Sequence, residues 1–105
     1  MVVEAVGVSE EMLGNSGVSK KMVGVCDKLG FHIIKTYKHL FTPQGISLVF
    51  ILKESHLAIH TWPEKGYFHM DAVTCSKEDV KIMRLVEELV LQFKPRSTRV
   101  LRLKY

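Results

Sequence analysis

The stretch ESHLAIHTWPE, residues 54–64, follows the most hydrophobic run of the chain, ISLVFILK at 46–53. A short continuous apolar run of this kind is typical of a central strand of a sheet. Strand-favouring residues continue over 56–62, which predicts the next strand. The turn signal PEKG at 63–66 separates it from a further strand at 67–74. Consecutive strands joined by short turns predict a sheet at the centre of the fold.

Five further elements surround these strands. They are strands over 2–8, 31–41 and 98–104, a helix over 19–29, and a helix opened by a capping box at 76–79 and ended by Pro95. Ser19 is the predicted N-cap of the first helix and Gly30 its stop. The order β-α-β-β-β-β-α-β predicts the α+β class, as a two-layer α/β sandwich with one mostly antiparallel sheet and two helices on one face.

Helical spacing predicts the buried face of each helix. The first helix is expected to bury Met22, Val25, Cys26 and Leu29, and the second Ile82, Leu85, Val86, Leu89, Val90 and Phe93. Cys26 is therefore expected in the core rather than as a reactive thiol. A turn is expected at 14–17, before the first helix. The sheet face away from the helices needs a cover or must tolerate water, and self-association into a dimer is a natural answer.

The chain has 105 residues, of which 47% are apolar and 25% charged, so a single globular domain over 1–105 is expected. The net charge is +4, and basic residues concentrate at 94–105. This tail predicts either a nucleic-acid surface or a strand edge whose charge blocks unwanted pairing, and we favour the second. No signal peptide is expected from residues 1–11, and no apolar run approaches the ~20 residues of a membrane span. A cytoplasmic protein with reduced thiols, and with neither membrane nor nucleic acid as partner, is expected.

Polar side chains near residues 54–64 carry the candidate chemistry. His56 and His60 would share one side of a strand, about 13 Å apart, which is too far for two ligands of one ion. Cys75 is the only other soft ligand nearby, so no metal site is expected. Ser55 lies between an acidic residue and a histidine, and Cys75 ends a strand, where a thiol could act as nucleophile or proton donor. Each of these side chains also has a purely structural interpretation.

Three linked blocks resemble one family, the short prokaryotic S-adenosylmethionine decarboxylase proenzymes. The blocks are FTPQGIS at 41–47, ESHLAIHTWPE at 54–64 and DAVTC at 71–75. The resemblance implies that the chain cuts itself between Glu54 and Ser55, and that this serine becomes a pyruvoyl group. The products would be chains 1–54 and 55–105, with no external cofactor. The resemblance also implies a homodimer of cleaved protomers with active sites between them.

The same resemblance implies a role for each matched residue. Ser55 Oγ would attack the Glu54 carbonyl to form an ester. Ser47 would donate to the oxyanion, and His60 would remove the α-proton in the elimination that cuts the chain. The pyruvoyl ketone would form a Schiff base with S-adenosylmethionine and take up electrons as carbon dioxide leaves. Cys75 would protonate the carbanion, which yields the aminopropyl donor for spermidine synthesis.

Substrate contacts are also implied by the family. Phe41 would stack on adenine, and Glu64 would accept hydrogen bonds from the ribose hydroxyls. Trp62 is expected to pack beneath the site, and His56 to have a local packing or hydrogen-bonding role. Without the family, Phe41 would be assigned to the end of a strand and Glu64 to a turn.

The first strand departs from the family pattern. Many relatives carry an aromatic residue and an acid where this chain has Ala5–Ser9. Two alternatives therefore stay open. One is a pyruvoyl-dependent arginine decarboxylase of the same family, and the other is an unprocessed homologue that binds a ligand without turnover.

Overall fold

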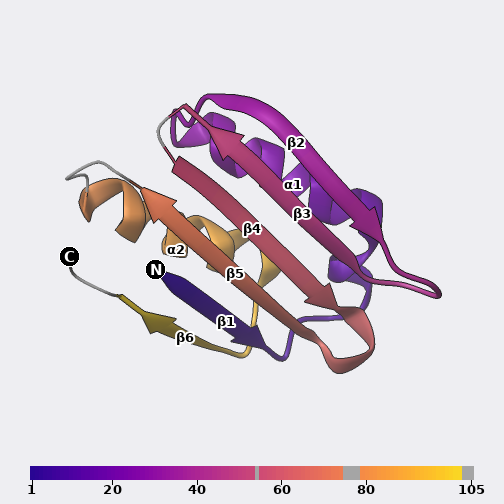
Figure 1. Cartoon of the computed structure of the whole chain (residues 1–105). Coiled ribbons are helices and arrows are strands. Elements are labelled where there is room, and N and C mark those ends of the chain that lie inside the picture. Colours follow the sequence, from indigo (N-terminus) through magenta and orange to yellow (C-terminus); the bar gives the residue numbers. More distant parts are fainter. Residues whose placement is uncertain (54, 75–78, 103–105) are drawn as a thin grey trace.

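The computed structural model describes residues 1–53, 55–74 and 79–102 (Figure 1). The strands are β1 (Val2–Val6), β2 (Ile33–Leu40), β3 (Ile46–Leu52), β4 (Ser55–Trp62), β5 (Tyr67–Thr74) and β6 (Ser97–Leu101). The helices are α1 (Asn15–Lys28) and α2 (Asp79–Phe93), and the short 3-10 helices are η1 (Glu11–Leu13) and η2 (Pro63–Lys65). The predicted order of strands and α-helices is confirmed.

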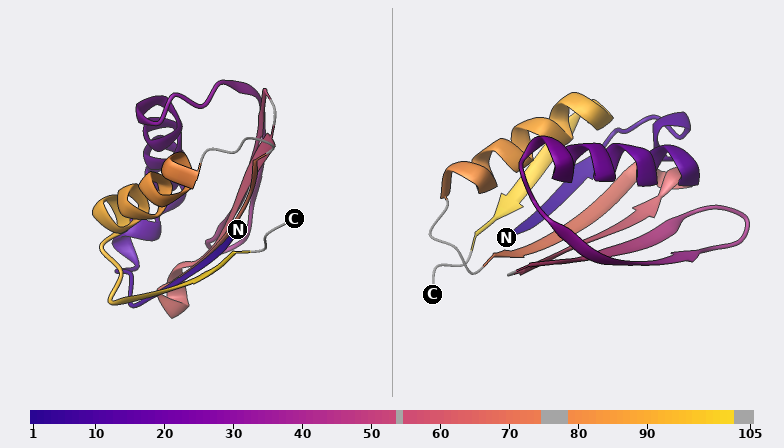
Figure 2. Two further views of the ribbon diagram at one scale, coloured as in Figure 1. Left: turned by 90° about the vertical axis from the view of Figure 1, so that its left-hand side faces the viewer. Right: turned by 90° about the horizontal axis from the view of Figure 1, so that it is seen from above.

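The six strands of the described residues form one sheet in the order β2-β3-β4-β5-β1-β6, and every neighbouring pair is antiparallel. Both helices lie against one face of this sheet, and no helix of the described residues covers the opposite face (Figure 2). The two-layer α/β sandwich is therefore confirmed. Neither helix in the described ranges is long and apolar enough to cross a bilayer.

The core lies between the sheet and the helices. Alternate strand residues face the helices, so β3 buries Ile46, Leu48, Phe50 and Leu52. The helices contribute the predicted Met22, Val25, Cys26, Leu29, Leu85, Leu89 and Phe93, all buried, with Val86 partly buried against them. Val90 is 39% exposed, so its predicted burial is wrong. It lies one residue beyond buried Leu89, which turns it toward the solvent side of α2; the side chain of Ile82 lies outside the described residues.

The start of α1 differs from the prediction. The helix begins at Asn15 with Gly14 as N-cap, so residues 14–17 are not a separate turn and Ser19 is not the cap. The reason is tertiary packing: Val18 is fully buried and continues the face of Met22 and Val25 by one turn. Burial of one more apolar residue outweighs the weak turn propensity of the sequence. The predicted stop is correct, because Gly30 has φ of 75° and Phe31 N–H donates to the Cys26 carbonyl at 2.8 Å.

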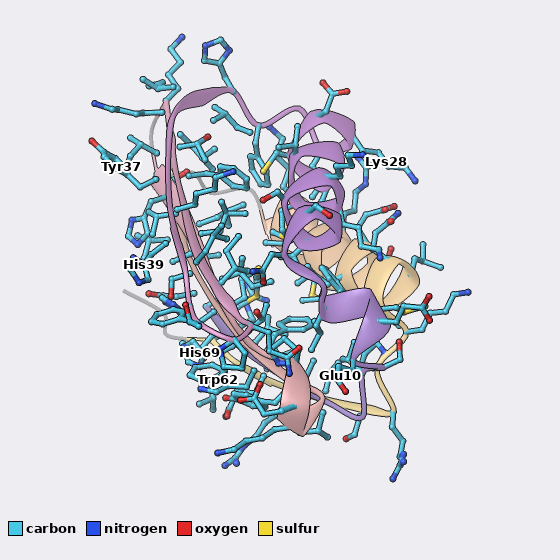
Figure 3. The ribbon with its side chains drawn as sticks, turned by 90° about the vertical axis from the view of Figure 1, so that its right-hand side faces the viewer. Glu10, Lys28, Tyr37, His39, Trp62 and His69 are labelled. Carbon is cyan, nitrogen blue, oxygen red and sulfur yellow. The ribbon has the colours of Figure 1, made fainter. Side chains whose placement is uncertain are left out.

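We call the helix-free side of the sheet the open face. It is lined by the strand residues that alternate with the core residues. Its exposed large apolar side chains are Val6, Tyr37, Ile51, Trp62 and Leu101. Figure 3 shows Tyr37, His39, Trp62 and His69 on this side, with Lys28 on the helix side. The candidate catalytic pair also lies on the open face.

Candidate active site

Ser47 and His60 form a hydrogen-bonded pair on the open face. They are register partners on β3 and β4, and Ser47 Oγ lies 2.7 Å from His60 Nδ1. Alternation places both side chains away from the helices, next to core residues such as Leu48 and Ile59 that face the other way. A hydroxyl and an imidazole at this distance can exchange a proton, as a general base requires.

The environment of His60 disfavours the charged form of its imidazole. Partial burial lowers the pKa of His60, and the neighbouring imidazole of His69 lowers it further, against an opposing effect of Asp71. A charged imidazole is disfavoured both by loss of water and by a second positive charge. A neutral imidazole is the form that accepts a proton, so the site is suited to base chemistry.

Ser55 is not brought to His60 within one chain. It is the half-buried first residue of β4, five positions before His60, which corresponds to about 16 Å along a strand. Alternation also places Ser55 on the side of buried Leu57, whereas His60 is on the open face. Glu54 and Cys75, the other residues predicted to take part in cleavage and decarboxylation, lie outside the described residues.

The predicted ligand residues lie on two turns that touch. Phe41 follows β2, is 49% exposed, and its N–H donates to the Gly45 carbonyl at 2.9 Å. A Cβ on Gly45 would lie 3.1 Å from the Thr61 carbonyl oxygen and 3.8 Å from Pro63 Cδ. The turn that carries Phe41 therefore packs against the end of β4 and the start of η2. Glu64 is exposed on η2, so both predicted ligand residues occur at the same end of the sheet.

Trp62 and His56 lie where the strand pattern places them. Trp62 is 39% exposed on the open face, and its ring centroid is 5.3 Å from that of Tyr67. It packs against Tyr67 on the open face, because alternation along β4 turns it away from the core. Its place beneath the site stays a prediction. His56 is half-buried, opposite Ile51 and Val73, so a local packing role stays its prediction.

The sequence interpretation missed the polar residues that β5 and β1 bring beside His60. His69 is the register partner of His60, and the ring centroids are 6.3 Å apart. Tyr67 donates to Glu4 Oε2 at 2.6 Å. The alternation over 67–74 already placed Tyr67, His69 and Asp71 on one side of a strand. The register that aligns His69 with His60 follows from the short connection at 63–66.

Fold and site together define a class of protein. The protein is a small α/β-sandwich domain with a serine–histidine pair on an exposed sheet face and turns that offer an aromatic ring and a carboxylate. The family model for S-adenosylmethionine decarboxylase matches residues 1–104. The chain belongs to this family, which confirms the resemblance carried by the three sequence blocks.

Individual relatives are similar in sequence over nearly the whole length of this chain. The S-adenosylmethionine decarboxylase proenzyme of Methanococcus maripaludis is 37% identical over 105 residues, which covers 99% of this chain and 85% of that protein. The proenzyme of Thermococcus kodakarensis is 38% identical over 104 residues, with coverage of 98% and 72%. The crystal structure of the adenosylmethionine decarboxylase from Aquifex aeolicus superposes with a TM-score of 0.84 at 22% identity and covers 93% of this chain and 81% of that one. This last likeness supports the fold.

Proposed function

We propose that the protein is a self-processing, pyruvoyl-dependent decarboxylase of S-adenosylmethionine. Family membership supports the reaction class. The observation that carries the proposal is the Ser47–His60 hydrogen bond of 2.7 Å, beside a lowered His60 pKa. It supplies a hydroxyl donor and a neutral base together, which are the two groups that an ester-forming backbone cleavage needs.

In the cleavage step, Ser55 Oγ bonds to the Glu54 carbonyl carbon and the peptide C–N bond breaks, which leaves an ester. Ser47 donates to the oxyanion while it exists. His60 then removes the α-proton of residue 55, the Cβ–O bond breaks, and Glu54 leaves as a carboxylate. Water replaces the nitrogen that remains on residue 55, ammonia departs, and a ketone results. No oxidant or metal takes part in this balance.

The resulting pyruvoyl group, when present, supplies an electron sink for loss of carbon dioxide from an amino acid. Ser55, which would carry it, begins β4 and is half-buried, so the group would meet both the sheet and solvent. Cys75 would deliver a proton to the substrate carbon. Phe41 would stack on the adenine and Glu64 would hold the ribose hydroxyls, from the two adjoining turns described above.

The distances support a homodimer whose protomers share the site. His60 is about 16 Å of strand away from Ser55 in its own chain. A second copy packed on the open face would bring its own His60 toward the start of β4, where Ser55 lies. The exposed apolar side chains of the open face, including Tyr37, Ile51 and Leu101, favour such a cover. The Ser47–His60 pair of one protomer would then act on Ser55 of the other protomer.

Mass spectrometry of the denatured protein tests self-processing. We expect two fragments, residues 1–54 and 55–105, and a borohydride-reducible carbonyl on the second fragment. Ser55→Ala should give one intact chain, and Ser55→Thr, which keeps a hydroxyl, should retain slow cleavage. An intact wild-type chain after long incubation would support the unprocessed homologue instead.

A mixing experiment tests the shared site. Ser55→Ala and His60→Ala chains are co-expressed with different tags. If His60 acts across the dimer, about half of the His60→Ala chains are cut, because mixed dimers make up about half of the population. If His60 acts within its own chain, none of these chains is cut.

Release of labelled carbon dioxide identifies the substrate. We expect release from carboxyl-labelled S-adenosylmethionine and none from carboxyl-labelled arginine. Phe41→Ala should raise KM for S-adenosylmethionine by about tenfold, since one base–aromatic stack contributes about 1–3 kcal/mol. Release of carbon dioxide from arginine alone would show that the protein is an arginine decarboxylase of the same family instead.

A further inference from the structure

A single row of polar side chains crosses the open face. The register pairs link one residue from each strand, in the order His39, Ser47, His60, His69, Glu4 and Arg99. The proposed reaction uses Ser47 and His60 from this row. His69 touches neither of the bonds that change, yet it is the direct neighbour of the base.

The imidazole rings of His60 and His69 lie close enough for a charge on one to affect the other. The ring centroids of His60 and His69 are 6.3 Å apart, with 42° between the ring planes. Protonation of both rings would set two positive charges at this separation on a partly buried surface. Like charges at this separation repel each other, so a charge on one ring disfavours a charge on the other. A proton on His69 thus favours a neutral His60.

We propose that His69 is a positioning residue of the self-cleavage reaction, which holds His60 in its neutral, proton-accepting form from the adjacent strand. The inference rests on the proposed role of His60 in processing. Glu4 supports it from the far side, because it is the register partner of His69 and accepts a hydrogen bond from Tyr67 at 2.6 Å. Its carboxylate offers negative charge next to His69.

The other charged groups that face His60 divide clearly by strand. From β5 they are its register partner His69 and the carboxylate of Asp71, which pairs with Ala58; the neutral phenol of Tyr67 lies on the other side of His69, opposite Trp62. From β3 the facing residues are Ser47 and Val49, neither of which carries charge. On β4 itself, His56 lies four residues earlier on the same face. Asp71 acts against His69, since it raises the pKa of His60 where His69 lowers it.

Because His69 and Asp71 shift the pKa of His60 in opposite directions, their substitutions should have opposite effects on cleavage. A purely structural role of His69 would not give this result. Refolded proenzyme is followed by the appearance of residues 1–54 across pH 5 to 9. In His69→Gln the imidazolium of His60 becomes easier to form, so the acidic limb of the rate profile moves to higher pH and cleavage there slows about three- to tenfold. In Asp71→Asn the same limb moves to lower pH and cleavage there quickens. His32→Gln, which removes an exposed histidine outside the row, serves as the matched control and leaves the limb in place.

A second measurement separates this inference from the proposed function. In the uncleavable Ser55→Ala chain, the His60 ring is titrated by NMR with and without His69→Gln or Asp71→Asn, and the two changes are expected to move its midpoint in opposite directions. If wild type never cleaves, the proposed function fails and the inference with it. If wild type cleaves but neither the limb nor the His60 midpoint moves in His69→Gln, only the role of His69 is overturned. Should His69→Gln not fold, His69→Asn and Asp71→Asn carry the same comparison.

Discussion

At the scale of single residues, the Cys26 thiol is a test of the core. It is fully buried on α1, and burial raises its pKa from 9.0 to about 11. The reactive thiolate is therefore roughly a hundredfold scarcer near pH 8 than for an ordinary cysteine, in addition to being shielded. We expect iodoacetamide at pH 8 to leave Cys26 unmodified in the folded protein and to modify it in guanidinium. Peptide mass mapping checks this, and equal labelling in both states would contradict the assigned burial.

The Tyr67–Glu4 hydrogen bond gives a second prediction at this scale. Burial and the Glu4 carboxylate raise the pKa of Tyr67 to about 12. Because the folded-state pKa lies above the ordinary value of 10.0, the stability that the bond contributes is present below pH 10 and is lost as pH rises through about 12. Tyr67→Phe should lower the free energy of unfolding by about 1 kcal/mol at pH 8. The difference from wild type should shrink above pH 10, as measured by urea denaturation; equal stability at pH 8 would exclude the bond.

At the scale of elements, two glycines should respond to alanine in opposite directions. Gly24 is exposed in α1 and a Cβ there meets nothing within 4 Å, so Gly24→Ala should stabilise the protein by about 0.5–1 kcal/mol through helix propensity. Gly66 ends η2 with φ of 60°, and a Cβ there would lie 2.7 Å from the Val8 carbonyl oxygen. Gly66→Ala should destabilise it by about 2 kcal/mol.

Urea midpoints of the two glycine variants check this pair. Gly66 also accepts a hydrogen bond from Val8 N–H at 3.0 Å, so the strain would be felt where the end of β1 meets η2. A Gly66→Ala variant as stable as wild type would show that this turn adopts another backbone conformation. Since Glu64 lies in the same turn, the variant should also weaken substrate binding if Glu64 holds the ribose.

At the scale of the whole molecule, the open face should decide the oligomeric state. Val49 is half-buried near the centre of this face, on β3 between Tyr37 and Ala58. A charge there would be buried in any face-to-face dimer, so Val49→Glu should give monomers and abolish self-cleavage. The matched control is Val23→Glu, since Val23 is 47% exposed on α1 in the other layer.

Sedimentation equilibrium of the two valine variants, with far-UV circular dichroism to verify folding, checks the dimer. We expect a folded monomer for Val49→Glu and an unchanged dimer for Val23→Glu. A Val49→Glu dimer that still cuts itself would place the shared site elsewhere on the molecule.

Much of this architecture could be predicted from local pattern. Period-2 alternation and the turn at 63–66 gave strands at 56–62 and 67–74 that match β4 and β5 to within one residue. The burial of Met22 and Leu85 followed from helical spacing in the same way. The start of α1 at Asn15 could not be predicted, because its cause is the burial of Val18 against other elements rather than any cap in the sequence.

The sequence by itself determined the element order, the sandwich class and the family, because side-chain periodicity and linked motif blocks are written along the chain. It also singled out Ser47 and His60, which form a hydrogen bond in the folded protein. Only the tertiary structure decided that His69 stands beside His60 and that Tyr67 donates a hydrogen bond to Glu4. Both depend on strand register and on which face a side chain takes. Those relations arise between residues that meet only when the sheet assembles.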